Sequence, residues 1–277
     1  GAEGLLGIVT EAWLRLTPVP ERVETVLISF STIRDATETV AAIIGAGILP
    51  AALELMDRRI LDAVRQAFGL EFPEATQSML LVECDGDPVE CKREIEQVFE
   101  LAKAPIEARL AQSEEQRASF WMARKKGIGA MGRLAPTIVT HDGVIPPSKL
   151  PEMLEFVYEV AEQHQVGVAN LFHAGDGNLH PCFYFDDREP GAVERVVNAG
   201  EAIMRRCIEL GGSLTGEHGI GIEKLDMMPL MFSEADLEMQ GWVRDAFNPT
   251  NLCNPCKVIP NQKGCIEHRR RWRGAAT

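Results

Sequence analysis

The pattern from which the fold is predicted begins in ETVLISFSTIRDATETVAAIIGAGILPAALELM (residues 24–56). Its first seven residues, 24–30, are rich in β-branched and aromatic side chains and predict a strand. Residues 32–45 carry apolar side chains at helical spacing behind Ser31, which is placed to cap a helix. The apolar run 51–56 predicts a second strand. A strand–helix–strand unit therefore stands in the first quarter of the chain.

The same alternation continues through the rest of the chain. Further strands are expected near residues 11–16, 79–84, 137–141 and, as a pair, 166–185. Further helices are expected at residues 58–68, 87–103, 113–126, 147–165, 190–210 and 233–247, the last capped by Ser233 with Asp236 behind it. Two runs of such units joined by short loops predict an α+β fold, with helices stacked on one face of a largely antiparallel sheet.

The composition argues against several classes of function. The 277 residues carry 28 lysines and arginines against 41 aspartates and glutamates, a formal charge of −13, and dense positive charge occurs only in the run 268–273. Nucleic-acid binding needs a basic face and is therefore not expected. The apolar stretch 40–53 is too short to span a bilayer, and seven scattered cysteines suit a reducing, cytoplasmic compartment.

Two histidines flank a turn in NLFHAGDGNLHPCFYF (residues 170–185). The dipeptide Asp176-Gly177 favours a tight turn, and a hairpin that closes there places His173 and His180 across from each other. Two imidazoles around one turn can bind a single metal ion. The alternative is that both histidines cap strand ends and bond to the loop.

A second segment, GGSLTGEHGIG (residues 211–221), places a glutamate beside a histidine among five glycines. Glycines let a backbone approach a ligand closely. One of Glu217 and His218 can complete a His/His/Glu metal site that leaves positions open for substrate. The other can act as a general base, because imidazole titrates near neutral pH. A glycine-rich corner of the chain would explain the glycines but not the Glu–His pair.

Several motifs together resemble one enzyme family. They are HAGDGNLH (residues 173–180), GEHGIG (216–221), LCNPCK (252–257), WMARK (121–125) and DGVIP (142–146). The set is similar to the C-terminal part of FAD-linked oxidases of the vanillyl-alcohol oxidase class. Within that class it most resembles the glycolate oxidase flavin subunits, with D-lactate and D-2-hydroxyglutarate dehydrogenases as relatives.

The resemblance implies a domain plan. Residues 1–21 are similar to the last segment of the family's FAD-binding domain, most of which would then lie outside this sequence; the start at Gly1 rather than methionine agrees with a piece of a longer protein. Residues 22–247 look like the substrate or cap domain, with two ferredoxin-like halves. Residues 248–277 look like a segment that returns toward the flavin and ends in a tail.

The resemblance also implies roles for individual residues. His173, His180 and Glu217 would hold a divalent metal (zinc, iron or manganese), and His218 would take the substrate's hydroxyl proton. Arg124 would pair with the substrate carboxylate, which its planar fork suits, and Asn178 would add a hydrogen bond. The residues implied near FAD are Glu3, Gly4, Gly7, Ile8, Asn254 and Lys257.

The implied activity is oxidation of glycolate or D-lactate to the 2-oxoacid, with hydride transfer to FAD, by an enzyme that is inactive without its FAD-binding domain. The electrons would pass to an iron–sulfur subunit, and such partners would bring the protein to the periphery of the inner membrane. Relatives that act on 2-hydroxyglutarate have a threonine and a lysine near the substrate, where this chain has Ile128 and TIVT (137–140). A small monocarboxylate is therefore favoured over a five-carbon diacid.

Two other readings stay open. The chain can be a non-catalytic subunit or fragment that binds metal and a carboxylate without a flavin, or it can belong to the phenol- or aldehyde-oxidising branch, which has no need of Arg124. The pair Cys253 and Cys256 lacks the further cysteines of a zinc or iron–sulfur site. Glu54 and Asp57, around the second strand, are assigned no role.

Overall fold

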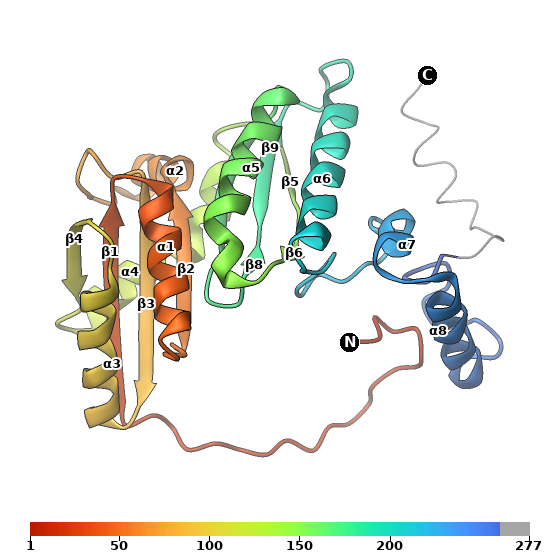
Figure 1. Cartoon of the computed structure of the whole chain (residues 1–277), viewed down its shortest axis with the longest axis horizontal. Helices are drawn as coiled ribbons and strands as arrows, with labels where there is room; N and C mark the ends of the chain where they lie inside the picture. Colours follow the sequence, from red (N-terminus) through yellow and green to blue (C-terminus); the bar gives the residue numbers. More distant parts are fainter. Residues whose placement is uncertain (261–277) are drawn as a thin grey trace. The chain divides into compact units, whose positions relative to one another are not determined.

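The computed structural model of this chain describes residues 1–260 (Figure 1), so the basic run 268–273 lies outside the described residues. The chain divides into two compact units. Pro18–Gly212 forms one, here called the sheet unit. Gly1–Thr17 and the chain from Ser213 onward form the other, here called the end unit. No helix among the described residues is long and apolar enough to cross a membrane.

The first half of the sheet unit is a ferredoxin-like arrangement. Its elements are β1 (Arg22–Phe30), α1 (Ile33–Gly45), β2 (Ala52–Asp57), α2 (Arg58–Phe68), β3 (Ser78–Gly86), α3 (Pro88–Leu101) and β4 (Pro105–Leu110). The strands lie in the order β4-β1-β3-β2, and each neighbouring pair is antiparallel. This is the split βαβ pattern, with α2 inserted between β2 and β3.

The second half repeats part of that pattern. Its elements are α4 (Glu114–Met131), β5 (Thr137–Thr140), β6 (Gly143–Val144), the short 3-10 helix η1 (Pro147–Lys149), α5 (Leu150–Gln163), β7 (Gly167–His173), β8 (Asn178–Leu179), β9 (Pro181–Phe185) and α6 (Ala192–Glu209). Strand β9 lies between β5 and β7, and β7 pairs with β2. The β2–β7 pairing joins the two halves into one nine-stranded sheet.

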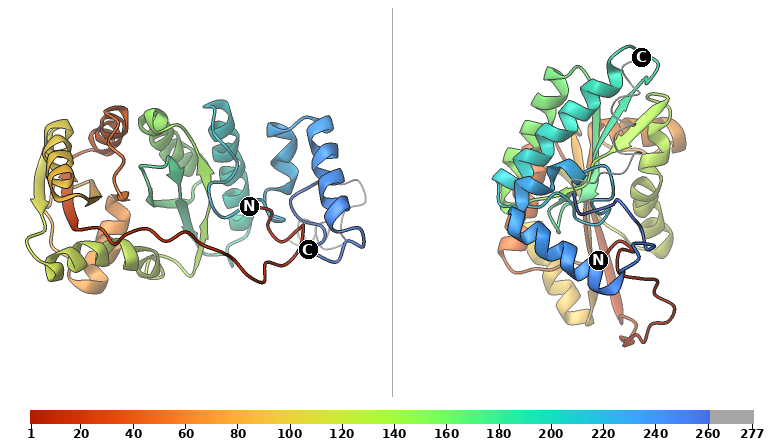
Figure 2. Two further views of the ribbon diagram at one scale, coloured as in Figure 1. Left: turned by 90° about the horizontal axis from the view of Figure 1, so that it is seen from below. Right: turned by 90° about the vertical axis from the view of Figure 1, so that its right-hand side faces the viewer.

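Helices cover both faces of this sheet, which corrects the expectation of a single covered face (Figure 2). Leu27, Met56 and Leu81 pack in one core cluster with Ile60 of α2 and Phe120 of α4. Successive residues of a strand point to opposite faces. The neighbouring residues Ile28, Leu55 and Leu80 are equally buried and face the other side, where α1, α3 and α5 lie. Strands that are apolar on both faces require two helical layers.

The expected elements form with three local differences. Thr32, not Ser31, caps α1, because its side chain accepts from the Asp35 amide. The strand expected at residues 11–16 is absent; this stretch is extended and its Trp13 is 99% exposed, since no described strand pairs with it. Strand β4 was not expected, because this edge strand has no buried residue and so lacks an apolar pattern. The Ser233–Asp236 capping box is confirmed at the start of α8 (Glu234–Phe247).

Asp57 ties together three elements of the sheet unit. Its buried carboxylate caps α2 by accepting from the Ile60 amide, and it accepts from Tyr158 Oη of α5 and from both the backbone and side-chain nitrogens of Asn170 on β7. Burial raises the pKa of this carboxyl, although the hydrogen bonds oppose the shift. The end of β2 is therefore held rigidly against β7.

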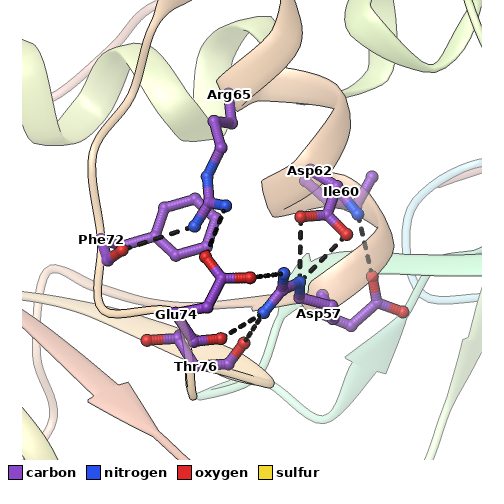
Figure 3. A network of polar contacts seen from close by, with 8 residues as sticks. Asp57, Ile60, Asp62, Arg65, Phe72, Glu74 and Thr76 are labelled. Carbon is purple, nitrogen blue, oxygen red and sulfur yellow. Dashed lines mark hydrogen bonds and ion pairs between the residues drawn. The ribbon is translucent and has the colours of Figure 1, made fainter.

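A second polar network fixes the loop between α2 and β3 (Figure 3). Arg58 binds Asp62 and also donates to the Glu74 and Thr76 carbonyls. The Arg65 guanidinium lies 3.9 Å from the Phe72 ring centroid and donates to the Glu74 carboxylate. These contacts use side chains of α2 to hold a loop that has few buried residues of its own.

Candidate functional site

A tight turn brings two histidines together in the sheet unit. Strand β7 ends at His173, β8 begins at Asn178, and His180 follows it. Gly177 has φ +68°, and a Cβ there would lie 2.0 Å from the Ile145 carbonyl oxygen, so only glycine fits. The two imidazole rings end up with centroids 5.5 Å apart and planes at 80°.

The histidine pair has the chemistry of a metal site. His180 is buried and its Nε2 lies 3.7 Å from Asp142 Oδ1, while the His173 side chain is 32% exposed. One ring nitrogen of each histidine lies within 4.8 Å of the other. Imidazole nitrogens bind zinc and related ions at about 2.0–2.1 Å, so each ring can offer one nitrogen to a shared ion. The fully buried carboxyl group of Asp142 lies beside His180.

Arg124 and Glu54 complete this group. Arg124, on α4, donates from Nε to Glu54 Oε2 at 2.6 Å, and its Nη2 lies 3.3 Å from His173 Nε2. The other oxygen of Glu54 lies 2.6 Å from His173 Nδ1. Glu54 and His173 are directly opposed residues of β2 and β7. Arginine, histidine and glutamate thus form a closed triangle of contacts.

Glu54 is the site residue that the sequence prediction missed. It is only 5% exposed and lies in a strand that is otherwise apolar down to Asp57. A carboxylate in a buried strand needs partners, and this is the signal that could have identified it. Its partners Arg124 and His173 are 70 and 119 residues away in the sequence, so they could be identified only from the tertiary structure.

Asn178 lies beside the histidine pair. It is the register partner of His173 across β7 and β8 and is 6% exposed. Its side-chain oxygen has no hydrogen-bond partner within the described residues. Buried polar atoms are nearly always hydrogen-bonded, so this oxygen suits a ligand that supplies a donor.

The remaining candidates lie in the end unit. His218 Nε2 is 3.7 Å from Glu217 Oε1, and both side chains are about half exposed. The carboxylate of Glu3 accepts from the Ile220 and Gly221 amides at 2.8 Å each. Gly219 has φ +86°, and a Cβ there would lie 2.6 Å from Glu3 Cδ. Glycine is therefore needed where the first residues of the chain meet this loop.

The residues expected near FAD also lie in the end unit. Asn254 donates from Nδ2 to the Glu3 carbonyl at 2.6 Å, and a Cβ on Gly4 would contact the Asn254 Cβ. Lys257 donates to the Pro255 carbonyl at 3.5 Å, and Ile8 is 88% exposed. The structure therefore groups Arg124, His173, Asn178 and His180 in the sheet unit, and groups Glu3, Gly4 and Asn254 around the loop that carries Glu217 and His218.

Curated relatives match nearly the whole chain. It is 39% identical over 269 residues to the glycolate oxidase subunit GlcD of Escherichia coli (strain K12), covering 96% of this chain and 54% of that protein. It is 35% identical to the same subunit of Bacillus subtilis (strain 168), covering 94% and 56%. It is 28% identical to a probable mitochondrial D-lactate dehydrogenase of Danio rerio, covering 94% and 52%. The chain spans about half the length of these relatives.

Solved structures share the fold. 4-Ethylphenol oxidase from Gulosibacter chungangensis, in its isoeugenol complex, superposes with a TM-score of 0.65 at 15% identity, covering 90% of this chain and 56% of that one. Substrate-bound p-cresol methylhydroxylase gives a TM-score of 0.63 at 12% identity, covering 85% and 52%. Residues 19–258 match the family described as FAD linked oxidases, C-terminal domain. The chain belongs to the C-terminal domain family of the FAD-linked oxidases.

Proposed function

We propose that this chain is the substrate-binding part of a flavin-dependent 2-hydroxyacid dehydrogenase that oxidises glycolate or D-lactate to the 2-oxoacid. The observation that carries the proposal is the placement of Arg124 beside the His173–His180 pair. A cationic fork and a pair of metal-binding imidazoles are the groups needed to hold a carboxylate and its neighbouring hydroxyl. The names of the relatives, glycolate oxidase subunit and D-lactate dehydrogenase, support the same substrate class.

We propose that His173 and His180, together with Glu217 of the end unit, hold a divalent metal: zinc, iron or manganese. The donor set of two imidazoles and one carboxylate suits these ions and leaves positions for substrate. A bound metal supplies Lewis acidity that lowers the pKa of the substrate hydroxyl, and bound FAD supplies the acceptor for hydride.

The side chains of the chain itself orient the substrate and move its proton. Arg124 uses two donors on Glu54 and His173, and a guanidinium has five, so donors remain for the substrate carboxylate. Asn178 Oδ1 accepts a hydrogen bond from the substrate hydroxyl before its proton is transferred. His218 removes the hydroxyl proton, which neutral imidazole can do near neutral pH.

We further propose that residues 1–21 are the last segment of the FAD-binding domain, that residues 22–247 form the substrate domain, and that residues 248–277 return toward the flavin and end in a tail. Residues 261–277 of this last segment lie outside the described residues. Glu3, Gly4, Gly7, Ile8, Asn254 and Lys257 would lie near FAD. The contacts of Glu3 with the 219–221 loop and with Asn254 support a shared role for these segments. The partners would be an FAD-binding domain and an electron-accepting iron–sulfur subunit, in the cytoplasm at the periphery of the inner membrane.

Anaerobic flavin reduction tests the activity. The full-length protein, loaded with FAD and metal, should lose the absorbance of oxidised flavin when mixed with glycolate or D-lactate. Reduction by p-cresol but not by either acid would assign the protein to the phenol-oxidising branch. No reduction by any of the three would support a non-catalytic binding subunit.

Elemental analysis tests the metal. The purified protein should contain zinc, iron or manganese near one equivalent, and both His173→Ala and Glu217→Gln should lose it. His164→Ala is the matched control, because His164 ends α5 outside the site. Metal that persists in Glu217→Gln would remove Glu217 from the ligand set.

A further inference from the structure

A buried carboxylate lies between the two side chains that the proposed function assigns to metal and substrate. We propose that Glu54 is the positioning residue of this site: it fixes the tautomer of His173 for metal binding and holds Arg124 for carboxylate binding. This inference rests on the proposed function, and it concerns a residue on β2 that contacts His173 and Arg124 but is itself assigned to neither the metal nor the substrate.

The contacts of His173 specify where its proton sits. A carboxylate paired with arginine is an acceptor only, so Glu54 Oε1, at 2.6 Å, requires the proton on His173 Nδ1. A guanidinium is a donor only, so Arg124 Nη2, at 3.3 Å, requires a lone pair on His173 Nε2. Two different neighbours thus favour the same tautomer, with Nε2 as the metal-binding nitrogen.

The same geometry links the metal to the arginine. The Nε2 lone pair that faces Arg124 Nη2 is the one a metal ion would use. A nitrogen with one lone pair cannot bind both, so a metal held by His173 Nε2 would leave an Arg124 donor available for the substrate carboxylate. The Nε contact with Glu54 at 2.6 Å keeps the guanidinium in place after that exchange. Glu54 therefore orients the proposed metal ligand His173 through Oε1 and the proposed substrate-binding Arg124 through Oε2.

The cross-strand register explains why Glu54 can do this and why few other positions could. Glu54 and His173 face each other across β2 and β7, which sets their side chains about 5 Å apart at the Cβ atoms. Leu81 pairs with Glu54 on the other side, and its side chain is not a hydrogen-bond donor. Arg124 approaches from α4, the helix that covers this face.

Imidazole ¹⁵N chemical shifts test the proposal without relying on activity. We would record them for the full chain, freed of metal by chelation, at a pH above 8, with His173→Gln used to assign the resonance. The wild-type protein should carry the proton on Nδ1. The glutamine of Glu54→Gln has one acceptor oxygen and one amide donor, whereas Arg124 and the Nδ1–H group of His173 are both donors. An amide donor that faces His173 Nδ1 favours the other tautomer, so a substantial Nε2–H population should appear. Zinc affinity should fall by about 10- to 100-fold, as for other outer-shell partners of metal-binding histidines.

Glu83→Gln is the matched control. Glu83 is also a buried glutamate that binds an arginine of α4, but it contacts no proposed ligand of metal or substrate. This variant should keep the wild-type tautomer and zinc affinity. Glu54→Asp is the second test variant: it retains a carboxylate, so Nδ1–H should persist, with zinc affinity between those of wild type and Glu54→Gln. If Glu54→Gln does not fold, Glu54→Asp and the wild-type tautomer still decide the question.

Three outcomes would overturn the positioning role: an Nε2–H tautomer in the wild-type protein, an unchanged tautomer in Glu54→Gln, or equal zinc affinity in Glu54→Gln and wild type. The proposed function fails in a different way. A wild-type protein that binds no zinc, iron or manganese and whose flavin is not reduced by 2-hydroxyacids would contradict it. The tautomer comparison between wild type and Glu54→Gln can be made in either case.

Discussion

Helix α4 carries two arginines that each bind a buried glutamate, and the two pairs have different consequences. Arg117 binds Glu83 of β3, and Arg124 binds Glu54 of β2. Both glutamates point to the same face of the sheet, because Glu83 pairs with Ala52, two residues before Glu54. Each is also bonded to the residue directly opposite on its other neighbouring strand: Thr25 for Glu83 and His173 for Glu54.

The two glutamates differ in what their hydrogen-bond partners can bind. Glu83 accepts from Arg117, Thr25 and Trp121, side chains with no proposed ligand to bind. Glu54 instead contacts His173 and Arg124, the two side chains proposed to bind metal and substrate. A buried Glu–Arg pair is therefore not a functional signal by itself. It becomes one when the carboxylate also orients a side chain that can bind metal or substrate.

Replacing each of the two arginines in turn should give the largest difference between the two pairs. Arg124→Met should lower kcat/KM for a 2-hydroxyacid by on the order of a hundredfold, because it deletes charge-assisted hydrogen bonds worth about 3 kcal/mol. Arg124→Lys should restore little, since lysine cannot form a bidentate contact. Steady-state kinetics of the FAD-loaded protein measure both. Arg117→Met is the control and should leave kcat/KM within about twofold. An equal loss of kcat/KM in both variants would contradict a substrate-binding role that is specific to Arg124.

The Glu83 pair should matter chiefly for stability. Glu83→Gln should lower the free energy of unfolding by about 2 kcal/mol, because it weakens hydrogen bonds to the charged Arg117 and leaves a donor without its carboxylate. Arg117 is 32% exposed, so water limits the loss. Urea denaturation measures this change. Val89→Ala, at an exposed position of α3, serves as a neutral reference; a change in Glu83→Gln no larger than this reference would contradict the assignment.

The contribution of Glu83 should also depend on pH. Burial raises the pKa of the Glu83 carboxyl, but hydrogen bonds from Arg117, Thr25 and Trp121 outweigh burial, so the pKa lies below its ordinary value. A folded-state pKa below the unfolded one gives stability that is present above the unfolded pKa and is lost as pH falls through the folded pKa. The stability difference between wild type and Glu83→Gln should therefore shrink in acid. Denaturation at pH 7 and pH 3 (about one unit below an ordinary carboxyl pKa) would show it; a constant difference would refute it.

The smallest effect is expected at Trp121. Trp121→Phe removes one hydrogen bond to Glu83 while keeping an aromatic ring, so the free energy of unfolding should fall by about 1 kcal/mol. The His173 tautomer should not change, because the hydrogen bond that is removed goes to Glu83, whereas His173 is bonded to Glu54. Denaturation and imidazole ¹⁵N shifts measure the two quantities. A tautomer change in this variant would show that the pairs are coupled through α4.

Local sequence signals predicted most of the fold's elements and the histidine pair of the candidate site. The strands at 24–30 and 79–84 follow from apolar runs, and the approach of His173 to His180 follows from the Asp176-Gly177 turn between them. The second helical layer was missed because a run of apolar residues does not reveal which face each one covers. Strand β4 was missed because its residues are half-buried or exposed at the sheet edge.

The role of Glu54 lay beyond local signals. Its contacts depend on the register of β2 against β7 and on the packing of α4 over both, which no window of sequence contains. Arg124 was identified only because the motif around it is similar to that of the family. Sequence patterns thus locate residues that face each other across a turn, whereas residues that meet across a sheet require the tertiary structure.

The make-up of the end unit has a consequence for how the protein is made. Glu3 binds the Ile220 and Gly221 amides, 217 and 218 residues later, and the Asn248 side chain donates to the Leu5 carbonyl. The sheet unit is one continuous segment and is complete once Gly212 has left the ribosome. The contacts of Glu3 and Leu5 can form only after residues 220–248 have been made, which is later than every residue of the sheet unit.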